Sequence, residues 1–304
     1  MVERTPLLNF FTHVILFLGF VAAVTPLAIV AIAASHNLAD VNRVPMPLVP
    51  GTDFWVNLKT AWTTAHLGPK LLNSLIFAGG VAAGKVILSA LTAFSLVYFR
   101  YPGRHLIFWL IFVTLMLPLE VRIVPTYAVA ANVLSPYQAI LDVTGISWLI
   151  EKVSGIQVSL QLGLLNSYPG LILPLVATAT GTFLYRQFFL TVPDELTEAA
   201  RMDGAGSLRF FIDILVPLSR TNMAALGTIM FLWAWNQYLW PLLVTTDPDH
   251  ATAVTELKQL IPNVGGLPEW HIAMAGTLIV MIPPLAVVVL MQRWVVRGVI
   301  ATEK

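Results

Sequence analysis

The residues that could support chemistry in this chain are few, and they are not grouped as catalytic sites are. There is no cysteine, which excludes disulfides and thiol chemistry. None of the six histidines has a second ligand at a metal-binding spacing; they are His13, His36, His66, His105, His250 and His271. No Ser-His-Asp set or carboxylate pair stands out within an apolar stretch. We therefore expect neither a catalytic residue nor a metal site.

One stretch nearly matches a nucleotide-binding motif. Residues 79–86 have the sequence GGVAAGKV, which follows the phosphate-binding pattern G-x-x-x-x-G-K-[ST] up to its last position. Val86 stands where the motif needs a magnesium-binding hydroxyl, and the stretch lies inside an apolar run and not after a strand. Gly80 and Gly84 are better explained as small residues that allow close helix packing in a membrane. We expect no nucleotide site here.

The elements that position these residues are predicted to be membrane helices. The chain is 57% hydrophobic and 11% charged, whereas a soluble domain is about a quarter charged. Several apolar runs approach or exceed the ~20 residues that cross a bilayer as a helix. We predict an all-α integral membrane protein with about six spans, at residues 14–34, 71–98, 105–125, 169–190, 221–244 and 271–292. The net charge of +1, without a basic patch, excludes nucleic acid as a partner.

The positive charges predict which side of the membrane each loop faces. Six spans put both termini on one side, and cytoplasmic loops are rich in Lys and Arg. With a cytoplasmic N-terminus, the inner side holds Arg4, Arg100, Arg104, Arg186, Arg201, Arg209, Arg220, Arg293, Arg297 and Lys304. The outer side holds Arg43, Lys59, Lys70, Arg122, Lys152 and Lys258, and Lys85 falls within a span. We therefore predict cytoplasmic termini and a cytoplasmic segment at residues 191–220.

That cytoplasmic segment has the pattern of two short helices with a glycine between them. Acidic residues after Pro193 suit a helix N-terminus, and Gly204 allows a sharp turn. A second helix then places four apolar residues on one side: Phe210, Phe211, Ile214 and Leu215. Such a segment is either a docking surface with apolar residues to spare or an ordinary amphipathic connection.

The same segment resembles the EAA loop of ABC importer permeases. That motif has Glu-Ala-Ala, three residues, Gly, nine residues, Ile, one residue and Leu-Pro. The chain matches it with Glu198, Ala199, Ala200, Gly204, Ile214 and Pro217, and differs only at Val216, where leucine is usual. In that family the loop is a coupling helix that sits in a groove of a separate ATPase subunit. The resemblance implies that contact for Glu198, Asp203 and Gly204, with the two alanines allowing close approach.

Other stretches resemble a narrower group, the carbohydrate-importer permeases of the maltose type. They are FLYRQFF at 183–189 and WNQYLWPLL at 235–243. LMLPLEVRIVPTY at 115–127, PMPLVPGT at 45–52 and the two ends of the chain are most similar to UgpE-type permeases of sn-glycerol-3-phosphate importers. Residues 134–165 contain a stretch, at about 134–160, that looks inserted relative to these permeases. We predict that it is extracytoplasmic, with ISWLIEKV as an amphipathic turn or two on the membrane surface.

The resemblance implies a single permease domain, residues 1–304, with the type I ABC importer permease fold in a bacterial inner membrane. It further implies a second homologous permease subunit, two ATPase subunits and an extracytoplasmic substrate-binding protein as partners. ATP and magnesium would be bound by the ATPases, and this chain would hold no cofactor. The implied substrate is sn-glycerol-3-phosphate or a glycerophosphodiester. A maltose- or trehalose-type sugar importer and a stand-alone secondary transporter remain alternatives.

Two groups of residues are candidates for the substrate pathway. Lys85, Glu120 and Arg122 are charged at or near membrane depth, where charge is costly. They either help an anionic phosphate ester to cross or form a structural ion pair or snorkel at a helix end. Trp233, Asn236, Gln237 and Trp240 are predicted to share one helix face. These four either line the pathway or form an interfacial aromatic belt.

Overall fold

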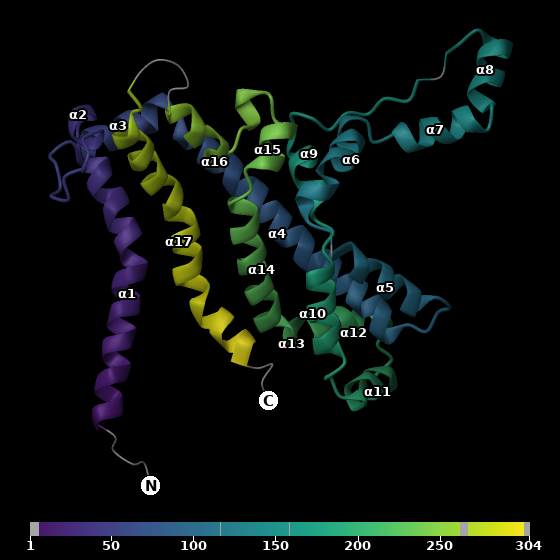
Figure 1. Cartoon of the computed structure of the whole chain (residues 1–304). Helices are drawn as coiled ribbons and strands as arrows, with labels where there is room; N and C mark the ends of the chain where they lie inside the picture. Colours follow the sequence, from purple (N-terminus) through teal and green to yellow (C-terminus); the bar gives the residue numbers. More distant parts are fainter. Residues whose placement is uncertain (1–5, 116, 158, 262–266, 301–304) are drawn as a thin grey trace. The chain divides into compact units, whose positions relative to one another are not determined.

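The structure is a computed structural model that describes residues 6–115, 117–157, 159–261 and 267–300. Every regular element in these ranges is a helix (Figure 1). The terminal residues predicted to be cytoplasmic, 1–5 and 301–304, lie outside the described residues, as do position 116 in the predicted third span and position 158 in the predicted insertion. The chain forms two compact units, Met1–Leu71 with Thr255–Ile282 and Leu72–Val254 with Pro283–Lys304.

The first unit is built around the N-terminal helix α1, Pro6–Ser35, which packs against α3, Phe54–Thr64. The short α2, Leu38–Val41, lies in the connection between them. The buried side-chain amide of Asn57 donates to the carbonyls of Ala34 and His36, at 2.9 and 2.7 Å. These bonds satisfy carbonyls that the end of a helix leaves without partners. η4, Leu257–Leu260, and the start of α17, Trp270–Ile300, complete the unit.

Three helices are long and apolar enough to cross a membrane unbroken: Leu7–Ser35, Leu67–Tyr98 within α4 and Trp270–Trp294 within α17. Three bent helix pairs bring the number of spans to six when each pair is counted as one. The all-α membrane architecture predicted with about six spans is therefore confirmed, with three to six spans depending on how the bent pairs are counted. Three of the predicted spans, however, are not straight helices.

The bends lie close to prolines, which remove a backbone donor and clash with the preceding turn. The predicted span 105–125 is divided into α5, Arg104–Leu115, and α6, Leu119–Ala131, whose apolar parts are bent by 106° at Pro118. The predicted span 169–190 comprises α9, Tyr168–Ile172, η1, Leu173–Leu175, and α10, Ala179–Phe189, with a bend of 51°.

The predicted fifth span, 221–244, is also wrong as one helix. α14, Arg220–Trp235, ends well before α15, Leu239–Val244. Pro241 has no N–H to give to the carbonyl of Gln237, and its ring clashes there, so the helix does not continue through residues 236–238. A second bend, of 75°, lies at Ser219 before α14, where the Ser219 hydroxyl donates back to the carbonyl of Leu215. Such back-bonding is a known cause of helix bending.

The stretch predicted as an insertion forms an arm of two helices, α7, Ser135–Val143, and α8, Ile146–Ser154 (Figure 1). The two helices contact each other and bury none of their residues. The chain then returns beside the end of α6, where the Leu164 N–H donates to the carbonyl of Ala130 at 2.8 Å. The predicted amphipathic helix at ISWLIEKV is present, and its membrane location stays a prediction.

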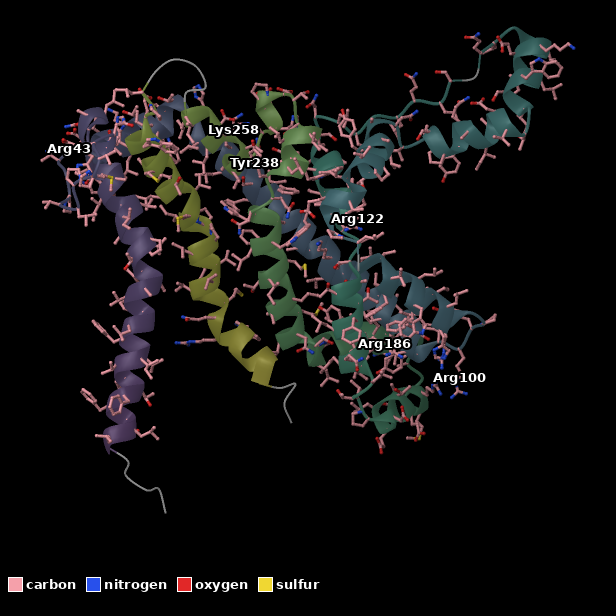
Figure 2. All side chains as sticks on the ribbon, in the orientation of Figure 1. Arg43, Arg100, Arg122, Arg186, Tyr238 and Lys258 are labelled. Carbon is pink, nitrogen blue, oxygen red and sulfur yellow. The ribbon has the colours of Figure 1, made fainter. Side chains whose placement is uncertain are left out.

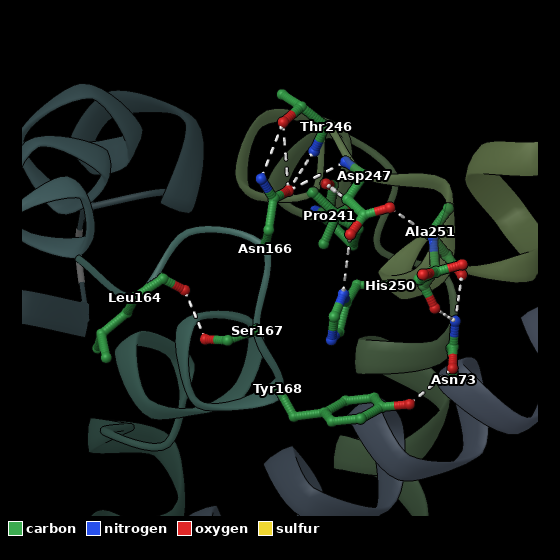
Figure 3. Close-up of polar contacts among 12 residues, drawn as sticks. Asn73, Leu164, Asn166, Ser167, Tyr168, Pro241, Thr246, Asp247, His250 and Ala251 are labelled. Carbon is green, nitrogen blue, oxygen red and sulfur yellow. Dashed lines mark hydrogen bonds and ion pairs between the residues drawn. The ribbon is translucent and has the colours of Figure 1, made fainter.

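A polar network ties the loops at one end of the second unit (Figure 3). The Asn166 side-chain oxygen accepts the backbone N–H groups of Thr246 and Asp247, at 2.7 and 3.0 Å. The Asn73 amide donates to the carbonyls of Asp249 and Ala251, and the Tyr168 hydroxyl bonds the Asn73 oxygen at 2.7 Å. These bonds fix the loops between η3, Pro248–His250, and α16, Ala253–Glu256, to the ends of α4 and α9.

Candidate functional site: a cationic cavity and a cytoplasmic helix pair

The second unit contains a cavity of about 520 Å³ among α4, α5, α6, α10 and α14. Five of the seven residues predicted for the substrate pathway line this cavity. Lys85, Glu120, Arg122, Trp233 and Gln237 line its wall. These residues come from three separate stretches of the chain, so the fold brings them together around one space. That volume lies within the ~300–1,000 Å³ range of small-molecule sites.

Lys85 is the most deeply buried charge in this cavity. It lies near the middle of α4 and is 5% exposed. Its ammonium lies over the ring of Trp233, with Nζ 3.6 Å from the ring centroid. The negative face of an indole attracts a cation, and the attraction strengthens when water is excluded. Trp233 thus holds the lysine head group at the cavity wall.

Arg122 follows the break at Pro118 and brings a second cation to the same wall. Its Nε atom is buried and has no hydrogen-bond partner. Among the described residues, neither Lys85 nor Arg122 forms an ion pair with Glu120 within 4.0 Å; the ion pairs seen include Arg209–Asp213 and His250–Asp247. The structural ion pair considered for these three residues is therefore wrong in this structure. Two cations and one exposed carboxylate leave the wall with an excess positive charge.

The N-terminus of α10 also opens on the cavity, which the sequence did not indicate. Thr178 precedes the helix without making a side-chain cap bond, and Thr180 and Thr182 line the wall with it. The first backbone N–H groups of a helix point outward unpaired, and the helix dipole favours negative charge there. The threonines of ATATGT at 177–182 could have pointed to a polar stretch here, but not to the residue at which the helix begins.

The other two residues predicted for the pathway lie away from the cavity. Trp240 is fully buried, and its indole N–H donates to the carbonyl of Leu171 at 3.1 Å. Asn236 is exposed at the end of α14, where its amide donates to the carbonyl of Leu232 at 2.8 Å. The single helix face predicted for residues 233, 236, 237 and 240 is absent because α14 ends before Asn236.

The predicted coupling segment begins with α11, Asp194–Met202, which follows Pro193 and has Asp194 and Glu195 in its first turn. Its end is a Schellman motif. Gly204 has a φ of +73°, its N–H donates to the carbonyl of Arg201, and the Ala205 N–H reaches back to the carbonyl of Ala200 at 2.8 Å. Glycine adopts this left-handed conformation without strain, which explains the glycine of the motif physically.

The second half of the segment continues as α12, Ser207–Phe210, the π-helical η2, Phe211–Leu215, and α13, Val216–Leu218. The wider π turn precedes Pro217, which cannot bond the carbonyl four residues before it. The two halves together form the end of the second unit that carries Arg100 and Arg186, away from Arg122 (Figure 2).

Buried aromatic residues join this segment to the membrane helices. Phe210 packs against Tyr98 with ring centroids 5.3 Å apart, and Phe211 packs against Phe94 at 4.9 Å. Ala200 belongs to the same buried cluster, which includes residues of α4, α10 and α14. This close packing connects α11 directly to three membrane helices.

The apolar side predicted for docking faces inward. Phe210, Phe211 and Leu215 are buried and Ile214 is half-buried in that cluster, so they are not available to a partner. The exposed residues of α11 and its C-terminal turn include Glu198, Ala199, Met202, Asp203 and Gly204, and Asp194, Glu195, Leu196 and Arg201 are exposed as well. Met202 is 84% exposed, which is unusual for a large apolar side chain. Met202 is not among the residues that the sequence predicted for this contact.

Residues 85–301 match the family model described as the binding-protein-dependent transport system inner membrane component. The chain belongs to this family. It is thus a multi-pass inner-membrane subunit of a binding-protein-dependent transport system, as the EAA motif led us to expect.

Curated relatives and a solved structure agree with this membership. The sn-glycerol-3-phosphate transport system permease protein UgpE of Yersinia enterocolitica is 46% identical over 310 aligned positions, covering 100% of both chains. The UgpE protein of Escherichia coli O1:K1 is 44% identical with the same coverage. A crystal structure of a bacterial ABC transporter involved in alginate import superimposes with a TM-score of 0.68 at 18% identity, over 96% of this chain and 98% of the other. The similarity to UgpE-type permeases is therefore confirmed, and the solved structure confirms the ABC importer permease fold.

Proposed function

We propose that this chain is the permease subunit of an ABC importer that moves sn-glycerol-3-phosphate, or a glycerophosphodiester, across the bacterial inner membrane. The observation that carries the substrate is the 44–46% identity to UgpE permeases along the whole chain. A cavity with excess positive charge agrees with an anionic substrate. The chain itself catalyses no reaction.

The complete importer contains a second homologous permease, two ATPase subunits and an extracytoplasmic substrate-binding protein. ATP and magnesium are bound by the ATPases, and this chain holds no cofactor. The termini and residues 191–220 face the cytoplasm, and the arm of α7 and α8 faces the opposite side. This orientation rests on the distribution of Lys and Arg.

The exposed surface of α11 and its terminal turn contacts an ATPase subunit. Glu198 and Asp203 supply acceptors, Met202 supplies apolar area, and Ala199 leaves room for a groove wall. ATP binding closes the two ATPases and moves α11. The aromatic cluster then transmits this movement to α4, α10 and α14, which changes the side of the membrane to which the cavity opens.

The test measures substrate-stimulated ATP hydrolysis and uptake by the reconstituted complex with its binding protein. Glu198→Ala removes a charged acceptor, so we expect stimulation to fall roughly ten-fold, the effect of one charge-assisted hydrogen bond. Ala199→Leu adds bulk at an exposed position, where it disturbs nothing within this chain but obstructs a groove. Glu151→Ala, an equal change on the exposed surface of α8, serves as the control.

Normal stimulation in both α11 variants would show that α11 is not the contact with the ATPase. Stimulation of the unmodified complex by maltose and not by glycerol-3-phosphate would retain the coupling role and refute the substrate. Uptake that needs no ATPase subunit would refute the proposed function altogether.

A further inference from the structure

The wall of the cavity gathers three groups that favour an anion, and they come from three different elements. Lys85 belongs to α4, Arg122 to α6, and the uncapped N-terminus at Thr178 to α10. Within the part of the chain that the structure describes, neither Lys85 nor Arg122 has a carboxylate within ion-pair distance. Burying positive charge without a negative partner is costly, so such an arrangement persists where an external anion occupies it.

The rest of the wall suits a small polyol attached to that anion. Thr92, Thr114 and Thr180 bring hydroxyl groups, and Gln237 brings an amide. The ring of Trp233, already under the Lys85 ammonium, offers an apolar face to carbon atoms. A nonpolar wall with a few convergent polar groups is the usual composition of a small-molecule site.

We propose that Lys85, Arg122 and the N-terminus of α10 bind the phosphate group of the transported molecule inside this chain. The inference rests on the proposed function and adds to it the place of the anion and the residues that hold it. Arg122 offers Nε and its remaining guanidinium donors, and Arg is suited to planar contact with phosphate oxygens. Lys85 acts as a point charge held by Trp233, and the α10 amides complete the site. Glu120, on the same wall, keeps the net charge low enough for the phosphate to leave again.

The experiment uses the complete reconstituted importer with its binding protein and sn-glycerol-3-phosphate as the probe. Lys85→Gln and Arg122→Gln remove one charge each with little loss of volume. We expect each to lower uptake at limiting substrate about ten- to hundred-fold, as a lost hydrogen bond to a charged group does. Arg122→Lys keeps the charge and is expected to retain more uptake than Arg122→Gln. Arg186→Gln is the matched control. Like Lys85, Arg186 places its cation over an aromatic ring, that of Phe108 at 4.5 Å, but it does not line the cavity.

Assembly is followed in every variant by copurification with the partner subunits and by basal ATP hydrolysis without substrate. Uptake like that of the unmodified complex in both Gln variants would overturn the phosphate site and leave the proposed function intact. Equal losses in Arg122→Lys and Arg122→Gln, with poor assembly in both, would make Arg122 structural and also overturn it. Failure of the unmodified complex to import glycerol-3-phosphate, despite normal assembly, would refute the proposed function and the phosphate site together.

Discussion

Replacing Gly204 by alanine tests whether the turn after α11 depends on its left-handed backbone conformation. Gly204 has a φ of +73°, and a Cβ built there would meet no atom within 4 Å. Any cost of the substitution therefore comes from the backbone and not from a clash. A left-handed alanine costs about 1–2 kcal/mol, and the loss of glycine's freedom in the unfolded chain offsets about 0.4–1 kcal/mol of that cost. We expect a net loss of about 1 kcal/mol in the stability of this turn.

Gly206→Ala is the matched control because its local space is equally open and its backbone is ordinary. Its φ is −70° and its ψ is 165°, which alanine adopts readily. The same chemical change two residues away is therefore expected to stabilise the segment by about 0.4–1 kcal/mol. The two variants differ in the sign of their effects, which a general response to mutation would not produce.

Hydrogen exchange of the Ala205 amide reports on the turn directly, because that N–H donates to the carbonyl of Ala200 at 2.8 Å. A loss of about 1 kcal/mol raises the exchange of this amide about five-fold in Gly204→Ala. Gly206→Ala is expected to leave it unchanged or slower. Equal exchange in the two variants would refute the Schellman explanation of the glycine in the EAA motif.

Three further substitutions test how the second unit is held together. Gly181→Ala places a Cβ 2.9 Å from the Ser89 Cβ, so we expect the stability to fall by about 1–3 kcal/mol. In the control Gly227→Ala, the new Cβ meets Val86 at an ordinary 3.7 Å, and we expect the helix to be stabilised by up to about 1 kcal/mol. Trp240→Phe leaves the buried carbonyl of Leu171 without its donor and is expected to cost about 1–3 kcal/mol without changing the apparent KM for uptake. Asn166→Ala removes the acceptor of the Thr246 and Asp247 amides, and we expect it to lower the stability by about 1–3 kcal/mol. Asn166→Asp keeps an acceptor and is expected to lower the stability by less.

Each of the three is measured as the melting temperature of the purified complex, with uptake recorded in parallel. A Gly181→Ala complex as stable as Gly227→Ala would contradict the close approach of α4 and α10. A raised KM in Trp240→Phe would return that residue to the substrate pathway. Equal melting temperatures for the two Asn166 variants would show that the loop network does not depend on the asparagine oxygen.

The membrane helices could be predicted from the sequence because length and hydropathy depend on local composition alone. α4 and α17 run through the predicted ranges 71–98 and 271–292. The prolines were visible too, but a proline in a membrane helix is often accommodated by its neighbours, so composition does not say which one bends the chain. Pro26 lies inside an unbroken α1, whereas Pro118 separates α5 from α6 by a sharp bend.

The candidate sites were predictable to different degrees for a related reason. Lys85 and Arg122 stood out because charge is rare at membrane depth, and both line the cavity. The face predicted for Trp233 through Trp240 assumed a continuous helix and failed with it. Thr178 carries no charge and its role depends on where α10 begins, which only the fold defines.

The excess charge of the cavity affects the rate of accumulation and not its limit. Moving an anion into a cell with a negative interior requires work of about 2.3 kcal/mol per charge for every 100 mV of membrane potential. Fixed cations such as Lys85 and Arg122 lower the electrostatic barrier partway across, but the potential difference between the two compartments is unchanged. Under the proposed function, that work is supplied by ATP hydrolysis in the partner subunits. Cells with the Lys85→Gln importer would therefore fill more slowly and still approach the same gradient.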